Sequence, residues 1–171
     1  MQVVHGYPDG TFRPEERVTR AEMACLLARA LKLASGDEDE LVFEDNAGIP
    51  VWAKGAVAAA VKEGLLKGYP QPGGGLSFGA ERPVTRAELA VLVARVVEKK
   101  LGPVPEAPLL FSDAGDIPSW AREAIGLVVT EGILGGYPDK TLRPGHYVTR
   151  AEAATVILRL LVKMGNVDVS K

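Results

Sequence analysis

The pentapeptide "VTRAE" occupies residues 18–22, 84–88 and 148–152 of a 171-residue chain. Each copy stands at the head of an apolar run, and the copies recur at nearly equal spacing. Recurrence at a fixed long period indicates repetition of one supersecondary unit. The chain is therefore expected to consist of tandem copies of a single motif, with the pentapeptide placed at the start of a helix.

Two further matched segments extend this repeat. The tripeptide "GYP" begins at Gly6, Gly68 and Gly136, ahead of each pentapeptide, and longer matched segments begin at Phe43 and Phe111. The first unit has no counterpart of the segment that begins at Phe43, so the chain holds two and a half repeats. The expected domains are a partial repeat over 1–35 and full repeats over 41–100 and 109–165.

Each full repeat is predicted to fold as loop, helix, loop, helix. The first helix is expected to begin near Pro50 or Pro118, because proline is tolerated in an opening turn, and to end near Gly68 or Gly136. The second helix begins at the threonine and carries an apolar stripe of helical period. In the first repeat this stripe contains Met23, Leu26, Leu27, Ala30 and Leu31. With aromatic residues at only 6%, the pattern predicts an all-α fold.

The threonine and glutamate of the pentapeptide have a structural explanation. Threonine followed three positions later by glutamate forms a capping box, in which each side chain accepts from a backbone amide of the helix start. Three such boxes are expected, formed by Thr19 with Glu22, Thr85 with Glu88, and Thr149 with Glu152.

Capping does not explain the arginine of the pentapeptide. Arg20, Arg86 and Arg150 occupy the first helical position, where a cation opposes the helix macrodipole. The free amides of a helix start favour an anion, and a guanidinium beside them offers a planar fork for a carboxylate or a phosphate. These arginines are therefore predicted to bind an anion. An ion pair with a carboxylate of the neighbouring repeat is the alternative.

Other recurring side chains suggest further roles. A second arginine of each repeat is expected to form a structural ion pair with the aspartate of the "FxD" motif. The tryptophans of the first helices either pack in the core or wall a polar pocket, and the sequence leaves both interpretations open. The "GYP" tyrosines are expected to brace the turn and to keep their hydroxyls free for a ligand. The residues concerned are Arg29, Arg95 and Arg159; Trp52 and Trp120; and Tyr7, Tyr69 and Tyr137.

Composition argues against several classes of function. A formal net charge of −2 gives no electrostatic footprint for nucleic acid or an anionic membrane, and no apolar run is long enough to span a bilayer. The single cysteine, Cys25, cannot form an internal disulfide or a thiolate cluster, and the two histidines lack ligand spacing. No nucleophile and base recur together. We therefore expect no cofactor, no metal and no catalytic site.

The start of the chain, "MQVVHGYPDG", lacks the charged and apolar regions of a secretory signal. If the protein acts outside the cell, we expect this chain to be a fragment or a processed piece.

The tandem pattern "FxD…WA…GYPDGTxRP…VTRAE" resembles the S-layer homology (SLH) domain family over nearly the whole chain. The resemblance implies an all-α spindle of pseudo-threefold symmetry with grooves between repeats. It also implies that the chain anchors a surface protein to the bacterial cell wall, by binding a secondary cell-wall polymer that carries a pyruvylated amino sugar. By the same resemblance, the carbohydrate-binding residues are Arg20, Arg86, Arg150, Asp45, Asp113, Trp52 and Trp120, with Tyr7, Tyr69 and Tyr137 beside them.

Two departures from this pattern lead to further expectations. Gly79 stands where the other loops have Arg13 and Arg143, so a groove that uses this loop is expected to be remodelled or unused. The absent half-repeat leaves an apolar face, which a second copy of the chain would cover in a homo-oligomer; truncation that the fold tolerates is the alternative. A different role, as a structural self-assembly element of a surface layer or filament, is the competing functional hypothesis.

Overall fold

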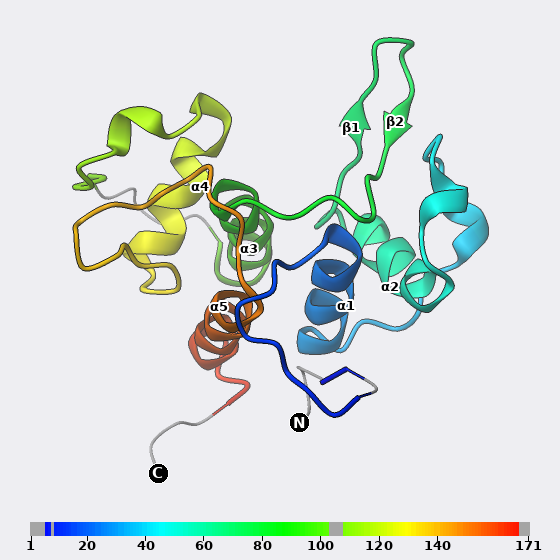
Figure 1. Cartoon of the computed structure of the whole chain (residues 1–171), viewed down its shortest axis with the longest axis horizontal. Helices are drawn as coiled ribbons and strands as arrows, with labels where there is room; N and C mark the ends of the chain where they lie inside the picture. Colours follow the sequence, from blue (N-terminus) through cyan, green and yellow to red (C-terminus); the bar gives the residue numbers. More distant parts are fainter. Residues whose placement is uncertain (1–5, 8, 103–107, 168–171) are drawn as a thin grey trace. The chain divides into compact units, whose positions relative to one another are not determined.

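Helices supply nearly all the regular structure of this protein, as Figure 1 shows. The structure is a computed structural model that describes residues 6–7, 9–102 and 108–167. The α-helices are α1 (Arg20–Ala30), α2 (Val51–Lys62), α3 (Arg86–Leu101), α4 (Ser119–Thr130) and α5 (Arg150–Lys163). A small antiparallel hairpin pairs β1 (Tyr69–Pro70) with β2 (Leu76–Ser77). The prediction of an all-α repeat fold is confirmed.

Complete capping boxes start three of the helices, as the pentapeptide spacing predicts. The threonine oxygens accept from the amides of Glu22, Glu88 and Glu152 at 3.2 Å in each case. The glutamates accept in return from the threonine amides at 2.9 to 3.0 Å. Because each cap satisfies amides that have no partner within the helix, it stabilises the fold by about 1 kcal/mol.

The predicted start of α2 is right and its predicted end is wrong. Pro50 is the residue before the first turn, as expected, but α2 ends at Lys62 rather than near Gly68. Gly64 adopts a left-handed φ of 71°, which closes the helix early by turning the next amides back onto the last helical carbonyls. The same geometry at Gly132, with φ of 69°, ends α4.

The chain divides into two compact units, Met1–Pro83 and Val84–Lys171, here called unit 1 and unit 2. Their boundary falls inside the second sequence repeat, directly before its pentapeptide. Each unit therefore combines the pentapeptide helix of one repeat with the first helix and loop of the next. In unit 1, α1 packs against α2, and in unit 2, α3 packs against both α4 and α5.

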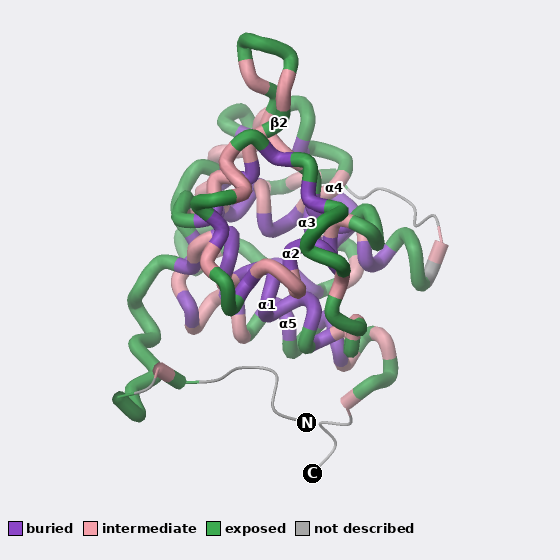
Figure 2. Tube along the Cα trace, turned by 90° about the vertical axis from the view of Figure 1, so that its right-hand side faces the viewer, coloured by how far each residue is buried: buried purple, intermediate pink, exposed green. Residues whose placement is uncertain are grey.

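The buried side chains of each unit are concentrated in the helices and the segments next to them (Figure 2). The largest fully buried side chains of unit 1 are Phe78, Met23, Leu27, Ile49, Leu66 and Val18, and those of unit 2 are Leu89, Ile125, Ile133, Leu142, Ile157 and Leu160. None of the helices in the described ranges combines enough length with enough apolar character to cross a bilayer.

The segment after α1 folds back onto α2. Lys32 takes a left-handed φ of 53°, which ends α1 and reverses the chain. The amide of Gly36 then donates to the carbonyl of Gly55 on α2 at 2.9 Å. The approach is close enough that a Cβ on Gly36 would lie 2.4 Å from the backbone nitrogen of Ala59. Only glycine fits this position without a shift of the backbone.

Substitution of this glycine is expected to destabilise unit 1. Gly36→Ala places a methyl group against the backbone of α2, and overpacking of this kind costs about 1–3 kcal/mol. The matched control is Gly48→Ala, because nothing lies within 4 Å of a Cβ built there and its φ is not left-handed. Urea unfolding measures the free energy of both variants. Equal stability of the two variants would contradict the close approach.

Candidate functional site

The pentapeptide arginine of unit 1 is buried and bound to backbone. The residue Arg20 is only 4% exposed. Its Nε donates to the carbonyl of Phe78 at 2.8 Å, and its Nη2 donates to the carbonyl of Lys67 at 2.9 Å. Both carbonyls belong to the segment that leads to the next pentapeptide. The guanidinium therefore ties the start of α1 to the loop of the following repeat.

Unit 2 repeats this arrangement one repeat further along the chain. The residue Arg86 is 5% exposed and donates from Nε to Leu142 at 2.7 Å and from Nη2 to Gly135 at 2.8 Å. Its Nη1 also lies 3.4 Å from Oε1 of Glu152, so the ion pair with the neighbouring repeat is present here. Arg150 is buried as well. Anion binding by the three pentapeptide arginines stays a prediction.

The "GYP" tyrosines cover these guanidinium groups. The guanidinium carbons of Arg86 and Arg143 lie 4.6 and 4.1 Å from the centroid of the Tyr137 ring. Such contacts between a guanidinium and an aromatic ring are attractive. The Tyr137 hydroxyl donates to Glu152, and burial together with this hydrogen bond raises the pKa of Tyr137.

The first "GYP" tyrosine is engaged in the same way. The single proton of the Tyr7 hydroxyl has two carboxylate acceptors within reach, Glu22 at 3.0 Å and Glu16 at 3.2 Å. The expectation that the tyrosine hydroxyls are free is therefore wrong for Tyr7 and Tyr137, because the pentapeptide glutamate of the same repeat accepts from them.

The loop that lacks the expected arginine keeps the same local conformation. Arg13 and Arg143 have left-handed φ values of 52° and 56°, and Gly79 has 67°. Glycine occupies that region without a steric penalty, so the exchange suits the backbone. Arg82 supplies the missing guanidinium, at 4.3 Å from the Tyr69 ring centroid. The same loop also contains the β1–β2 hairpin, which projects from unit 1 (Figure 1).

The predicted site aspartates also bind backbone. The carboxylate of Asp45 accepts from the amides of Phe78 at 2.6 Å and Gly79 at 2.7 Å, and from the hydroxyl of Ser77 at 2.9 Å. Desolvation, the largest contribution, acts to raise the pKa of Asp45, but these hydrogen bonds together outweigh it and lower the pKa.

Asp113 holds the corresponding loop of unit 2. Its carboxylate accepts from the amides of Leu142 and Arg143, each at 2.7 Å. Desolvation again acts to raise the pKa of Asp113, and the two amide hydrogen bonds lower it below its ordinary value. The predicted ion pairs between the "FxD" aspartates and the second arginines are therefore wrong. Backbone amides occupy both carboxylates instead.

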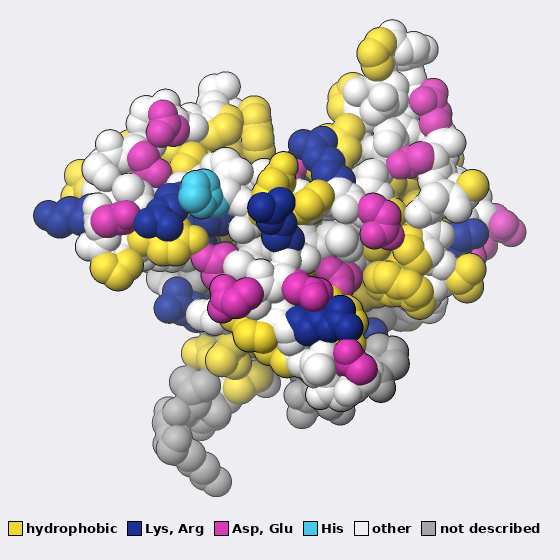
Figure 3. Space-filling view, in the orientation of Figure 1, with side chains coloured by type: hydrophobic (Ala, Val, Ile, Leu, Met, Phe, Trp, Pro, Cys, Tyr) yellow, Lys and Arg dark blue, Asp and Glu magenta, His cyan; other side chains and the backbone are white. Residues whose placement is uncertain are grey.

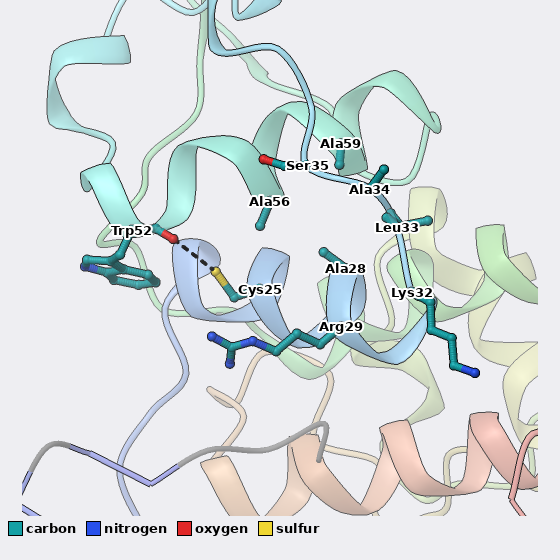
Figure 4. A pocket seen from close by; sticks show the side chains of 10 residues that line it. All are labelled: Cys25, Ala28, Arg29, Lys32, Leu33, Ala34, Ser35, Trp52, Ala56 and Ala59. Atoms are coloured by element: carbon teal, nitrogen blue, oxygen red, sulfur yellow. Dashed lines mark hydrogen bonds between the residues drawn. The ribbon is translucent and has the colours of Figure 1, made fainter. Parts of the chain in front are cut away.

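A pocket of about 270 Å³ lies between α1 and α2, entirely within unit 1 (Figure 4). Its lining residues are Cys25, Ala28, Arg29, Lys32, Leu33, Ala34, Ser35, Trp52, Ala56 and Ala59. The core interpretation of the tryptophans is wrong, because Trp52 and Trp120 are each 60% exposed. Trp52 instead forms one wall of this pocket, at the first turn of α2.

Two cations lie at the edges of the pocket. Figure 4 shows the Arg29 side chain extending from α1 toward the end that holds Trp52, while Lys32 extends the other way. Both side chains are exposed, and in the described part of the chain neither makes a hydrogen bond or an ion pair. Behind them lies the buried Cys25, whose Sγ is 4.0 Å from the carbonyl oxygen of Trp52. Burial raises the pKa of this thiol.

This arrangement differs chemically from the buried arginine sites. An exposed indole offers an apolar face to a sugar ring, and an unpaired guanidinium offers a fork to a carboxylate. Of the predicted site residues, the pocket contains Trp52 alone. Lys32 and Ser35 were not predicted. Arg29 was predicted to have a structural role. Its position as a charged residue in an otherwise apolar helix could have indicated an exposed side chain.

The face seen in Figure 3 has no extended charged binding surface. Basic and acidic side chains alternate there without forming a broad patch of one sign. Among the residues that the structure describes, no group of histidine, cysteine, aspartate and glutamate side chains could hold a metal ion.

Comparisons with known proteins identify relatives of this chain. A sequence model of the S-layer homology domain matches residues 1–24, 43–90 and 110–154. The chain is 34% identical over 166 residues to cell surface glycoprotein 1 of Acetivibrio thermocellus, covering 92% of this chain and 7% of that protein. It is 34% identical over 160 residues to the cellulosome-anchoring protein of the same organism, covering 91% and 34%. S-layer protein EA1 of Bacillus anthracis is 30% identical over 165 residues, covering 96% and 18%. The chain thus spans only a small part of these relatives.

The aspartate contacts predict a dependence of stability on pH. The pKa of Asp113 is lower in the folded protein than its ordinary value of 3.8, so its contribution is fully present above that value. That contribution is lost as pH falls below it. We expect Asp113→Asn to be less stable at pH 7 and to lose less stability than the parent between pH 5 and pH 3, as measured by urea unfolding.

The matched control for this experiment is Asp116→Asn. Asp116 lies in the same turn, is exposed, and makes no side-chain hydrogen bond among the described residues. Its variant should keep the acid-induced loss of the parent. A loss of equal size in the Asp113 variant would show that the carboxylate–amide contacts do not contribute.

Proposed function

Because the chain belongs to the S-layer homology (SLH) domain family, we propose that it is a non-catalytic anchoring module that binds a secondary cell-wall polysaccharide. In this role it would hold the protein that carries it at the bacterial cell surface. The names of its relatives, which include a cellulosome-anchoring protein and an S-layer protein, support the proposal. Because the chain matches only part of each relative, activities of their other parts are not transferred.

The observation that carries this proposal is the α1–α2 pocket of unit 1. It places the exposed face of Trp52 near the guanidinium of Arg29, which has no partner among the described residues. A pyruvate ketal on an amino sugar presents a carboxylate beside an apolar ring face, which matches these two groups. The volume of about 270 Å³ lies just below the range of about 300–1,000 Å³ that holds drug-sized ligands, and it suits one sugar residue.

We place the anion on Arg29 rather than on Arg20. A ligand carboxylate at Arg20 would have to displace the carbonyls of Phe78 and Lys67 from a side chain that is 4% exposed. Each buried carbonyl left without a donor costs about 1–3 kcal/mol, which would offset the new contact. Arg29 carries no such cost, since it makes no hydrogen bond within the described residues.

The affinity for a single sugar is expected to be modest. A hydrogen bond to a charged group contributes about 1.5–3 kcal/mol, and the pocket adds only a small apolar area. A polymer that presents many copies of the sugar compensates, because linked sites raise the effective concentration. Anchoring would then depend on avidity.

The homo-oligomer and the self-assembly role remain separate hypotheses. No described contact bears on them.

Titration calorimetry with a synthetic pyruvylated N-acetylmannosamine tests the pocket. Arg29→Ala is expected to weaken binding by about tenfold or more, because it removes the charged donor. Arg159→Ala is the matched control: Arg159 is an exposed arginine at the corresponding position of α5, where it lines a separate pocket of about 310 Å³, and its variant has the same net charge. It should bind as the parent does.

A third variant separates the two arginine sites. Arg20→Lys keeps the positive charge but cannot donate to both carbonyls, so we expect a lower melting temperature with the sugar affinity retained. Loss of binding in Arg20→Lys, with Arg29→Ala unaffected, would place the anion at the pentapeptide instead. No binding to the parent chain, by either the sugar or the cell-wall polymer, would overturn the anchoring proposal.

A further inference from the structure

The pocket of unit 1 exists because α1 ends early. Lys32, with its left-handed φ of 53°, lets the amide of Leu33 donate to the carbonyl of Ala28 at 2.9 Å, which closes the helix. The segment that follows runs back along α2 and supplies Leu33, Ala34 and Ser35 to the pocket lining. The early end of this helix therefore builds one wall of the pocket.

The corresponding helix of unit 2 does not end there. By alignment of the pentapeptides, the position of Lys32 corresponds to Glu98, which lies inside α3. The helix continues to Leu101 and ends only at Gly102, with φ of 78°. Residues that form a returning wall in unit 1 are thus helical in unit 2.

Two glycines, Gly36 and Gly55, allow the segment after α1 to approach α2 closely in unit 1. The corresponding residues of unit 2 do not make such an approach. Gly55 corresponds to Glu123, whose side chain is exposed on α4. A Cβ on Gly36 would clash with α2, whereas a Cβ on the corresponding Gly102 would meet nothing within 4 Å. The chain after α3 therefore does not press onto α4 at this point.

The charges at the two positions also differ. Unit 1 presents Arg29 and Lys32 without partners in the described residues. In unit 2 the corresponding arginine, Arg95, is half-buried, already has an interaction partner, and lies in the field of Glu98. On α4, the exposed Glu123 stands where unit 1 has Gly55. At the position of Lys32 itself, a ligand carboxylate would meet an opposite charge in unit 1 and the like charge of Glu98 in unit 2.

Building on the proposed function, we propose that an anionic saccharide binds the α1–α2 pocket of unit 1 and not the corresponding face of α3 and α4 in unit 2. This difference holds although Trp120 is as exposed as Trp52. Lys32 determines this specificity in two ways, since its backbone ends the helix that makes room for the wall and its side chain adds a second cation. The repeats of this chain are therefore similar in sequence and unequal in function.

Tryptophan fluorescence can report on each unit separately, because the chain contains only two tryptophans. In Trp120→Phe the emission comes from Trp52, and in Trp52→Phe it comes from Trp120. Titration with pyruvylated N-acetylmannosamine should change the emission of Trp120→Phe saturably. The emission of Trp52→Phe should stay constant over the same concentrations. N-acetylmannosamine without the ketal is the uncharged control and should bind at least about fivefold more weakly.

Lys32→Gly tests the contribution of the second cation. Glycine suits the left-handed φ, so the variant should keep the fold and the wall, with unchanged or higher melting temperature. Its affinity for the charged sugar, measured in the Trp120→Phe background, should fall by about fivefold. Unchanged affinity would remove Lys32 from the proposal.

The outcomes separate this inference from the proposed function. A saturable response of Trp120 overturns the restriction to unit 1 and leaves the anchoring function intact. Calorimetric binding to the parent chain with no response from either tryptophan overturns the assignment to the pocket. Absence of any calorimetric binding overturns both the anchoring function and this inference.

Discussion

A buried guanidinium that bridges two backbone carbonyls is the contact on which each unit depends. Arg20 and Arg86 sit at helix starts and each donates to two carbonyls of the following loop. A buried charge is costly unless it is fully hydrogen-bonded, so the loop must keep the position that supplies both acceptors. The aspartates Asp45 and Asp113 fix the same loops from the other side by accepting their amides. The cation and the anion together hold these segments, which contain little regular structure, against the helices.

This use of the pentapeptide arginine leaves the cell-wall ligand to other side chains. In unit 1, Arg29 near the end of α1 and Lys32 just after it have no partners among the described residues, and the early end of that helix opens a pocket beside Trp52. In unit 2 the longer α3 removes the corresponding wall. One residue in a left-handed conformation, Lys32, thus decides whether a repeat carries a binding pocket or only a packed pair of helices. Functional divergence between repeats can follow from a change of helix length, with the core left intact.

Local signals predicted much of this structure, and long-range contacts account for what they missed. The capping boxes and the start of α2 depend on residues within one turn of each other, so the sequence was sufficient. The partners of Arg20 lie 58 and 47 residues away along the chain, and no local pattern distinguishes a carbonyl acceptor from a ligand anion. The exposure of Trp52 and the lack of a described partner for Arg29 likewise depend on which distant segments pack beside them. The early ends of α2 and α4 have a local signal as well, because Gly64 and Gly132 precede the "GYP" glycines and suit a left-handed helix end.

The most direct test of this account follows the arginine side chains themselves. In protein labelled with ¹⁵N-arginine, the Nε–H signals of Arg20 and Arg86 should be protected from solvent exchange, because both donate to buried carbonyls. Addition of pyruvylated N-acetylmannosamine should shift the Arg29 signal and leave those two signals unchanged. Shifts of the Arg20 and Arg86 signals with Arg29 unmoved would contradict the account, because the buried arginines would then be the ligand-binding groups.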